Sequence, residues 1–178
     1  KTGRETARRL KPGITLNTST STDNQMTMNL SNATKSQQIV LASRPEGKPT
    51  ASNFKMASAE ISPIEHGEFL VKNEWMSVDP YMPGRMQDSD SYVPPFQVDQ
   101  PLEGGCIGKV IESRHEQFSE GDYVLGNLGW REFWKSNGEG VTSIDQALAP
   151  VQAYLGALGM TGMTAWVGLN KIARLKNN

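Results

Sequence analysis

A phenol and a carboxylate stand close together just after a stretch that alternates like a β-strand. From residue 75 the chain reads WMSVDPYMPGRM, with Asp79 and Tyr81 on either side of Pro80. Proline lacks an N–H and disfavours helical backbone in the residue before it, so the strand is expected to end near Asp79. Tyr81 then lies on a turn or short helix, where its hydroxyl can donate to a developing oxyanion. Alternatively, Tyr81, Met82 and Met86 only fill the end of a β-barrel.

Asp79 and Glu103 have the chemistry for acid–base work, although a surface or turn-capping role is the better interpretation of both. Metal ligands are scarce. A catalytic zinc needs about three Cys, His or carboxylate ligands and keeps one position open. The chain has one cysteine, Cys106, and two histidines, His66 and His115. We therefore expect no bound metal. A lone cysteine also forms no internal disulfide, which fits a reducing cytoplasm.

Two glycine clusters have spacings near that of a nucleotide-binding turn. A dinucleotide fingerprint must follow a strand and open a helix, so that the phosphates meet helix N–H groups. The cluster at 104–108 precedes a predicted strand, and no strand precedes the cluster at 156–162. Tight helix packing is the better interpretation of the second cluster, and neither predicts a nucleotide site on its own.

The elements that must position these residues are mostly short strands. Glycine and proline punctuation separates seven segments with strand character, which favours a closed or partly closed barrel. These segments are residues 38–42, 54–61, 68–75, 106–115, 122–126, 129–134 and 141–145. Two helices are expected after Pro150, over 151–158 and about 162–174, with Thr161 capping the second. We divide the chain into a tail (1–36), a β-rich domain (37–148) and a helical segment (149–178).

The tail is polar and basic, with six Lys/Arg against two Asp/Glu, whereas the net charge of the whole chain is -1. Such a composition predicts a disordered tail or a cloning remnant. A basic arm that contacts a nucleic acid or a membrane through Arg4, Arg8 and Arg9 is the minor alternative. The overall charge argues against a general nucleic-acid binder, and no apolar run reaches the roughly 18 residues of a membrane span. We expect neither nucleic acid nor membrane as a partner.

Five sequence blocks occur in an order that resembles one known family. They read SVDPYM.GRM, SYVPPF, PLEGG..IGKVIES, GDYVLG..GW and LGALGMTGMTAWVGL, between about residues 37 and 176. This order resembles the zinc-independent medium-chain dehydrogenase/reductases, in the branch of NADP-dependent 2-alkenal, prostaglandin and curcumin reductases. The resemblance implies a mainly β fold. It is a chaperonin-10-like (GroES-like), partly closed barrel with short C-terminal helices, truncated before the Rossmann domain.

The resemblance also implies an activity. It is NADPH-dependent reduction of the C=C bond of α,β-unsaturated carbonyl compounds, such as alkenals, enones or curcumin-like molecules. Tyr81 would be the catalytic donor and a cofactor contact, with the ribose hydroxyls of NADP as the alternative donor. Further cofactor contacts would be Met160, Gly162 and Thr164, and the substrate cleft would include Asp79, Tyr92 and Phe96. For Tyr92 and Phe96, an ordinary packed surface loop is the alternative.

The same resemblance implies a cytoplasmic enzyme with a small-molecule substrate, forming a homodimer as the full-length protein. The 178-residue chain alone is expected to be inactive. The alternative from another class is a non-catalytic binding or scaffold domain with a GroES-like fold. The chain departs from the family at Pro83, where relatives usually carry Arg. Proline removes a cation there, and it is expected to push Met82 away from helical dihedrals and to alter cofactor geometry near Tyr81.

Overall fold

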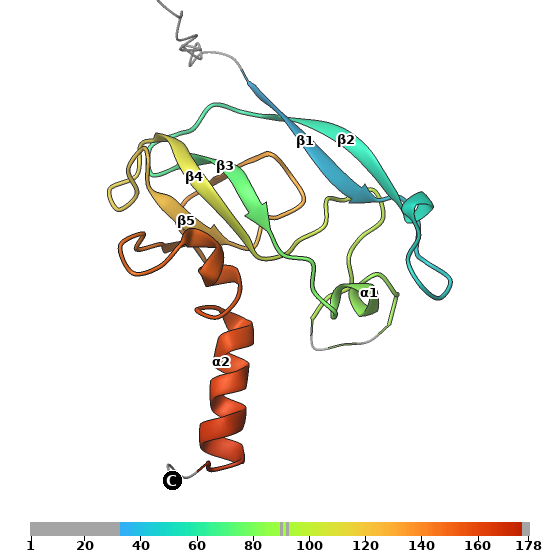
Figure 1. Ribbon diagram of the computed structural model, residues 1–178. Helices are drawn as coiled ribbons and strands as arrows, with labels where there is room; N and C mark the ends of the chain where they lie inside the picture. Colours follow the sequence, from blue (N-terminus) through green and yellow to red (C-terminus); the bar gives the residue numbers. More distant parts are fainter. Residues whose placement is uncertain (1–32, 90, 92, 176–178) are drawn as a thin grey trace, which may run out of the picture.

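The computed structural model describes residues 33–89, 91 and 93–175 (Figure 1). The strands are β1 (Thr34–Leu41), β2 (Phe54–Ile61), β3 (Phe69–Met76), β4 (Cys106–Ser113), β5 (Tyr123–Gly126), β6 (Phe133–Ser136) and β7 (Thr142–Ser143). The α-helices are α1 (Met82–Arg85) and α2 (Met160–Val167). There are also two 3-10 helices, η1 (Ala51–Asn53) and η2 (Val151–Leu155), and a π-helical segment, η3 (Gly168–Ile172), that follows α2. The expected mainly β fold is confirmed. Residues 1–32 of the predicted tail (1–36) lie outside the described residues.

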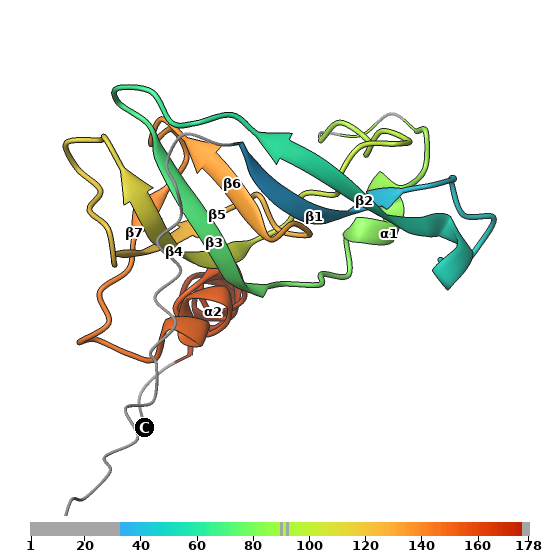
Figure 2. The same ribbon diagram turned by 90° about the horizontal axis from the view of Figure 1, so that it is seen from above.

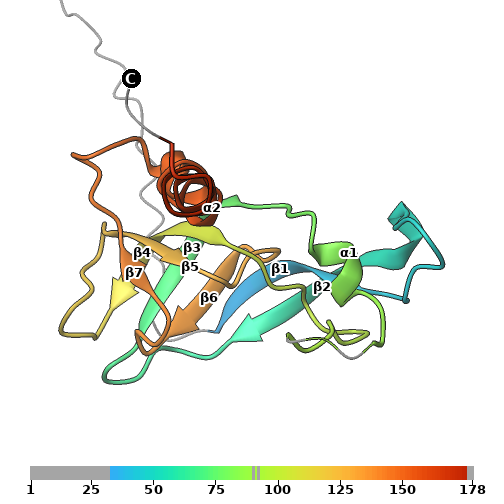
Figure 3. The same ribbon diagram turned by 90° about the horizontal axis from the view of Figure 1, so that it is seen from below.

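All strand pairs are antiparallel. β1 pairs with β2, and the other strands form a sheet in the order β6-β3-β4-β5-β7. Isolated bridges connect β1 to the rest of the barrel, between Gln38 and Arg131 and between Val40 and Pro101. In Figure 1, α2 extends away from the sheet that contains β3, β4 and β5, and Figures 2 and 3 show it nearly end-on, while α1 lies toward the end of the molecule formed by β1 and β2.

β1 begins earlier than its polar sequence predicts. Residues 34–36 belong to the strand, although their composition places them in the tail. These residues pair with residues 59–61 of β2, and the hydroxyl of Ser36 adds a second attachment, because it donates to Phe133 O (3.0 Å) and accepts from Phe133 N (3.0 Å). Ser36 is therefore buried, with 1% exposure, and a polar strand start is held in place by residues far along the chain.

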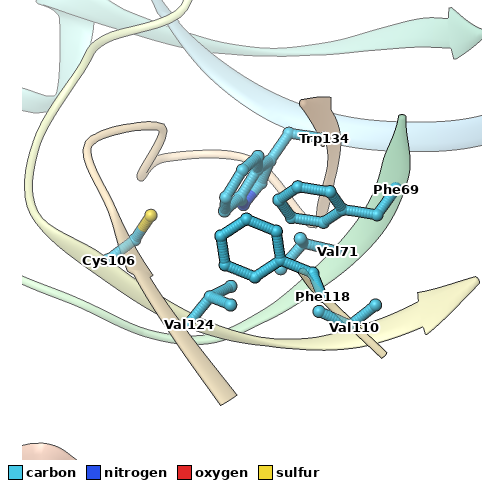
Figure 4. Packing of buried hydrophobic residues seen from close by; sticks show 7 residues of the cluster. All are labelled: Phe69, Val71, Cys106, Val110, Phe118, Val124 and Trp134. Atoms are coloured by element: carbon cyan, nitrogen blue, oxygen red, sulfur yellow. The ribbon is translucent and has the colours of Figure 1, made fainter. Parts of the chain in front are cut away.

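The first core cluster fills the barrel between β3, β4, β5 and β6 (Figure 4). Phe69 lies at its centre, with ring centroids 4.5 Å from Phe118 and 6.4 Å from Trp134. Stacked and edge-to-face aromatic pairs add to the free energy of apolar burial. The remaining members are Val71, Cys106, Val110 and Val124. Gly108 lets β4 approach β3, because a Cβ there would lie 2.7 Å from Lys72 O.

The single thiol in this cluster is expected to be unreactive in the folded protein. Burial raises the pKa of Cys106 from 9.0 to about 11, although N–H groups of Leu128 and Gly126 favour the thiolate. The thiolate is the reactive form, so iodoacetamide at pH 8 should alkylate the native chain far more slowly than the chain in urea. Equal rates in the two states would contradict this.

The raised pKa of Cys106 also makes the free energy of unfolding depend on pH. The unfolded chain loses this proton first, so the thiol's contribution to stability is complete below about pH 9 and is lost as the pH rises to about 11. The effect is at most about 3 kcal/mol. Urea unfolding of the wild type and of Cys106→Ala across this range isolates it, because the variant should lack this part of the pH dependence.

The C-terminal helix differs from the prediction. α2 begins at Met160 with Gly159 as N-cap, and it passes into η3 after Val167. Thr161 does not cap this helix, since its hydroxyl donates to Gly156 O (2.8 Å). The turn before α2 is too tight for a side chain at Gly159, where a Cβ would clash with Tyr154 O.

The predicted strand 129–134 is also shorter than expected, because Trp130 adopts a left-handed backbone conformation (φ 62°) and β6 starts at Phe133. The ring of Trp130 stacks on Phe54, with centroids 6.1 Å apart. Its indole N–H is the one buried side-chain polar atom, among the described residues, without a hydrogen-bond partner.

Candidate functional site

Tyr81 is held where β3 leaves the barrel. β3 ends at Met76, and Ser77 N then donates to Gly105 O (2.8 Å). The Ser77 hydroxyl donates to the carboxylate of Asp79 (2.6 Å), and Met82 N donates to Asp79 O (3.1 Å). Tyr81 is the N-cap residue of α1, which confirms the expected short helix after the strand.

The expectation for Pro83 was wrong in one respect. Met82 is the first residue of α1 and is helical, because Pro83 lies in the first turn, where an N–H has no intrahelical partner to lose. Met82 and Met86 are buried, with 1% and 3% exposure, in a second core cluster with Leu41, Phe96 and Leu102. These methionines do fill the end of the barrel. Tyr81, by contrast, is 45% exposed.

The phenol of Tyr81 is kept protonated by its surroundings. Partial burial raises its pKa above the ordinary value of 10.0, and the negative charge of Asp79 raises it further. The charge of Arg85 lowers the pKa, and the charge of Glu103 raises it. The net shift is upward, and a phenol with the ordinary pKa is already protonated near neutral pH, so this side chain is a hydrogen-bond donor there.

The loop that follows α1 is joined to it by Arg85. Phe96 N donates to Arg85 O (2.7 Å), and the Arg85 guanidinium lies 4.1 Å from the centroid of the Phe96 ring. Phe96 is only 4% exposed, yet it contributes to the wall of a cleft of about 590 Å³ that Arg85, Glu103 and Arg131 also line. Its contact with a substrate stays a prediction. Tyr92 lies outside the described residues.

The three residues assigned to the cofactor all lie on α2, apart from α1 in Figure 1. Met160 is 79% exposed, and the Thr164 hydroxyl donates to Met160 O (2.8 Å). Gly162 packs against the chain itself, because a Cβ there would clash with Ala157 O. This close approach explains the glycine without a ligand. The cofactor contacts therefore stay a prediction.

Arg85 is the site residue that sequence reasoning missed. It follows Tyr81 by four positions, and such pairs lie on the same side of a helical turn. That spacing was visible in the sequence and was the available signal. Its salt bridge to Glu103 (NH2 to Oε2, 3.0 Å) joins two segments 18 residues apart, which no local pattern indicates.

Among the described residues, no three His, Cys, Asp or Glu side chains come together as ligands for a metal. The ring of His115 is hydrogen-bonded within the protein, with Nε2 3.1 Å from Asn137 O and Nδ1 accepting from Gln117 N at 3.0 Å.

In the part of the chain that the structure describes, no helix has the length and apolar character needed to cross a bilayer.

Comparison with known proteins agrees with this architecture. Residues 37–144 match the family described as the N-terminal domain of oxidoreductase. A Bacillus subtilis protein, YfmJ, named as an NADP-dependent oxidoreductase, is 49% identical over 140 residues, which are 79% of this chain and 41% of that protein. The NADPH-dependent curcumin reductase of Escherichia coli is 37% identical over 142 residues, covering 80% of this chain and 41% of its own.

The crystal structure of CurA from Vibrio vulnificus in complex with NADPH superposes with a TM-score of 0.74. It is 39% identical, and the match covers 80% of this chain and 42% of that chain. The chain thus spans about two fifths of the length of the relatives it matches.

The fold and the comparisons define a class, the GroES-like N-terminal domain of a zinc-independent, NADP-linked oxidoreductase. The chain belongs to the zinc-independent medium-chain dehydrogenase/reductase family, in the branch of the curcumin, 2-alkenal and prostaglandin reductases.

Proposed function

We propose that this chain is the catalytic domain of an NADPH-dependent reductase of the C=C bond in α,β-unsaturated carbonyl compounds, with alkenals, enones and curcumin-like molecules as the substrate class. The observation that carries the proposal is the phenol of Tyr81, which is half-exposed (45%) at the start of α1, just after β3 leaves the barrel, and whose pKa is raised. Relatives named as curcumin reductase and 2-alkenal reductase support the choice of substrate class.

The chemistry of conjugate reduction explains why such a phenol is useful. When bound, a nicotinamide cofactor supplies a hydride to the β-carbon of the substrate. Negative charge then develops on the substrate's carbonyl oxygen. Without a metal, hydrogen-bond donors must stabilise that charge, and the Tyr81 phenol can do so while keeping its proton at neutral pH.

The remaining residues position this donor. Met82 and Met86 fix α1 in the second core cluster, so the Cα of Tyr81 has little freedom. A donor fixed before the substrate arrives loses little entropy when it binds the oxyanion. The exposed start of α2, at Met160, is the proposed contact with the cofactor. We further propose that the full-length protein is a cytoplasmic homodimer.

The test uses the full-length protein and follows NADPH absorbance with matched pairs of carbonyl compounds. A conjugated alkenal or enone should cause saturable NADPH oxidation and give the saturated aldehyde or ketone as product. The saturated analogue of the same chain length should cause none. An alcohol product from the conjugated aldehyde would overturn the substrate class.

Two controls separate this function from a non-catalytic scaffold. The 178-residue chain alone should show no saturable NADPH oxidation, because it spans only about two fifths of its relatives. The full-length protein should bind NADPH in a fluorescence titration. Failure of the full-length protein to bind NADPH would favour the scaffold.

A further inference from the structure

The cleft beside the 94–96 loop is lined by two arginines that come from distant parts of the chain. Arg85 is the last residue of α1, and Arg131 lies two residues before β6. Glu103 is the one carboxylate among the described residues that line the cleft, so its charged side chains leave a net charge of +1. The volume of about 590 Å³ is within the usual range for a small-molecule site.

Arg131 carries a positive charge that is not paired with a described carboxylate. Its Nε donates to Gly129 O (3.2 Å) and its NH2 donates to Leu102 O (3.2 Å), and both acceptors are main-chain carbonyls. No salt bridge between described residues involves it. Burial lowers the pKa of Arg131, and the negative charge of Glu103 opposes that shift. A charge that is partly removed from water is stabilised by an ionic partner, which is missing here among the described residues.

The guanidinium of Arg131 is placed at the cleft by its bond to Leu102. Leu102 lies between Pro101 and Glu103 in the chain, and both of these neighbours line the cleft. The carboxylate of Glu103 is already engaged, because it accepts from Arg85 NH2 (3.0 Å). Glu103 can balance one of the two cations, so one positive charge in the cleft is left over.

Each arginine also has hydrogen-bond donors left for a ligand. The Nε and NH2 of Arg85 are engaged by Pro94 O (3.0 Å) and Glu103 (3.0 Å), and no described acceptor is bonded to its NH1. The NH1 of Arg131 likewise has no bonded acceptor among the described residues. Neither NH1 is sealed from solvent, because in the described part of the chain Trp130 Nε1 is the one buried side-chain nitrogen or oxygen without a partner. Guanidinium N–H groups donate well to the oxygens of a carboxylate.

Much of the remaining wall of the cleft is apolar. The ring of Phe96 lies under the guanidinium of Arg85, with 4.1 Å between the guanidinium carbon and the ring centroid. The apolar lining residues are Val93, Pro94, Pro95, Phe96, Pro101 and Leu128. A hydrocarbon chain can lie against such a wall while a polar group at its end meets the arginines.

We propose that this cleft binds the carboxylate of a small organic acid with an apolar chain, and that the NH1 groups of Arg131 and Arg85 hold that carboxylate. The net charge of +1 in the cleft fits a monoanion. The acid is the substrate itself, carrying a carboxylate besides its conjugated carbonyl group, or a separate ligand. The inference does not depend on the proposed function, because it concerns the binding of a carboxylate alone.

The first experiment measures the binding of hexanoate to the full-length protein by ligand-observed NMR, with hexanamide as the uncharged match. Hexanoate should bind at least about tenfold more tightly, because hydrogen bonds to a charged group are the stronger ones. Arg131→Met should weaken hexanoate binding by at least about tenfold. Arg131→Lys should weaken it less, since Lys keeps the charge but not the planar fork. Equal affinities for the two probes, or an unchanged affinity in Arg131→Met, would overturn the proposal.

Arg44 provides the matched control for the loss of one cation. Like Arg131, it donates to two main-chain carbonyls, Met86 O (2.9 Å) and Phe96 O (3.3 Å). It is not among the residues that line the cleft. Arg44→Met should therefore change hexanoate affinity by less than about twofold. If Arg44→Met and Arg131→Met weaken binding equally, the effect is one of general loosening and the proposal fails.

Glu103→Gln is a variant whose expected effect cannot come from unfolding. The change removes the described carboxylate of the cleft but keeps an oxygen that can accept from Arg85. Hexanoate should then bind at least about threefold more tightly, because a repelling charge is gone. Weaker binding by this variant, with the circular dichroism spectrum of the wild type, would contradict the proposal.

Inhibition kinetics identify the source of the carboxylate. If the substrate carries it, hexanoate should compete with a conjugated enone, raising the apparent KM and leaving kcat unchanged. If the acid is a separate ligand, hexanoate should bind without such competition. Both patterns support the site, and they differ only in what fills it. A wild-type protein without NADPH-dependent turnover would refute the proposed function instead, and the binding measurements would still decide whether the cleft takes a carboxylate.

Discussion

Tyr81→Phe in the full-length protein is expected to lower kcat by about a hundredfold while leaving the fold intact. The change removes one donor and keeps the ring. Loss of a single oxyanion donor typically costs roughly 2.7–4 kcal/mol of transition-state stabilisation. We expect the low end of that range, because the ribose hydroxyls of the cofactor offer a second donor. KM should change less than kcat, since the negative charge exists only as the reaction proceeds.

The stability of the same variant distinguishes this role from a purely structural one. Tyr81 is 45% exposed and lies outside the second core cluster, so its hydroxyl should contribute at most about 1 kcal/mol to the free energy of unfolding. If Tyr81 only fills the end of the β-barrel, the reverse is expected: the variant should have normal turnover and lower stability. Urea unfolding and steady-state kinetics on one preparation decide between the two. Turnover within twofold of the wild type would remove Tyr81 from the site.

The largest loss of stability is expected from Phe69→Ala. Phe69 is 0% exposed and contacts Phe118, Trp134 and His115 through its ring, so the variant leaves a cavity at the centre of the first core cluster. Buried Phe→Ala changes typically cost about 3–5 kcal/mol, against a total stability of roughly 5–15 kcal/mol. The variant should unfold at a much lower urea concentration with a similar slope.

Leu148→Ala is the matched control for this prediction. Leu148 is 69% exposed, and removal of an exposed aliphatic side chain should change stability by less than about 0.5 kcal/mol. A loss below about 1 kcal/mol for Phe69→Ala would mean that the cluster closes over the missing ring, and it would contradict close packing at this position.

The sequence pattern predicted those elements whose conformation is decided by neighbouring residues. Alternation over residues 54–61 predicts β2 with its observed bounds, and Pro80 predicts the turn and short helix that carry Tyr81, although β3 ends at Met76 and not near Asp79. The buried positions of Met82 and Met86 followed from the usual burial of methionine. In these places the backbone preference of each residue and its final surroundings agree.

The misses occur where the backbone is decided by contacts that no simple local rule describes. Trp130 is left-handed although such a conformation disfavours a residue with a Cβ, and no turn residue there signals it. α2 starts at Met160 because the preceding turn closes against Tyr154 O, a contact within the turn that a capping rule for Thr161 cannot anticipate. For the site, the sequence placed Tyr81 on the right element but did not reveal the ion pair between the largely buried Arg85 and the half-exposed Glu103.

The contact between Ser36 and Phe133 has a consequence for biosynthesis. β1 and β2 are neighbours in sequence, so they can form a hairpin as soon as residue 61 is made. The hydroxyl of Ser36, however, meets its partner 97 residues later. The second half of β1 can pair with residues 98–102 earlier, but its start, around Ser36, keeps one unpaired edge until β6 is synthesised, because closing so long a loop opposes early docking. On a translating ribosome, the start of the first described strand is therefore among the last parts to be secured, and until then it is open to chaperones or to a second copy of the chain.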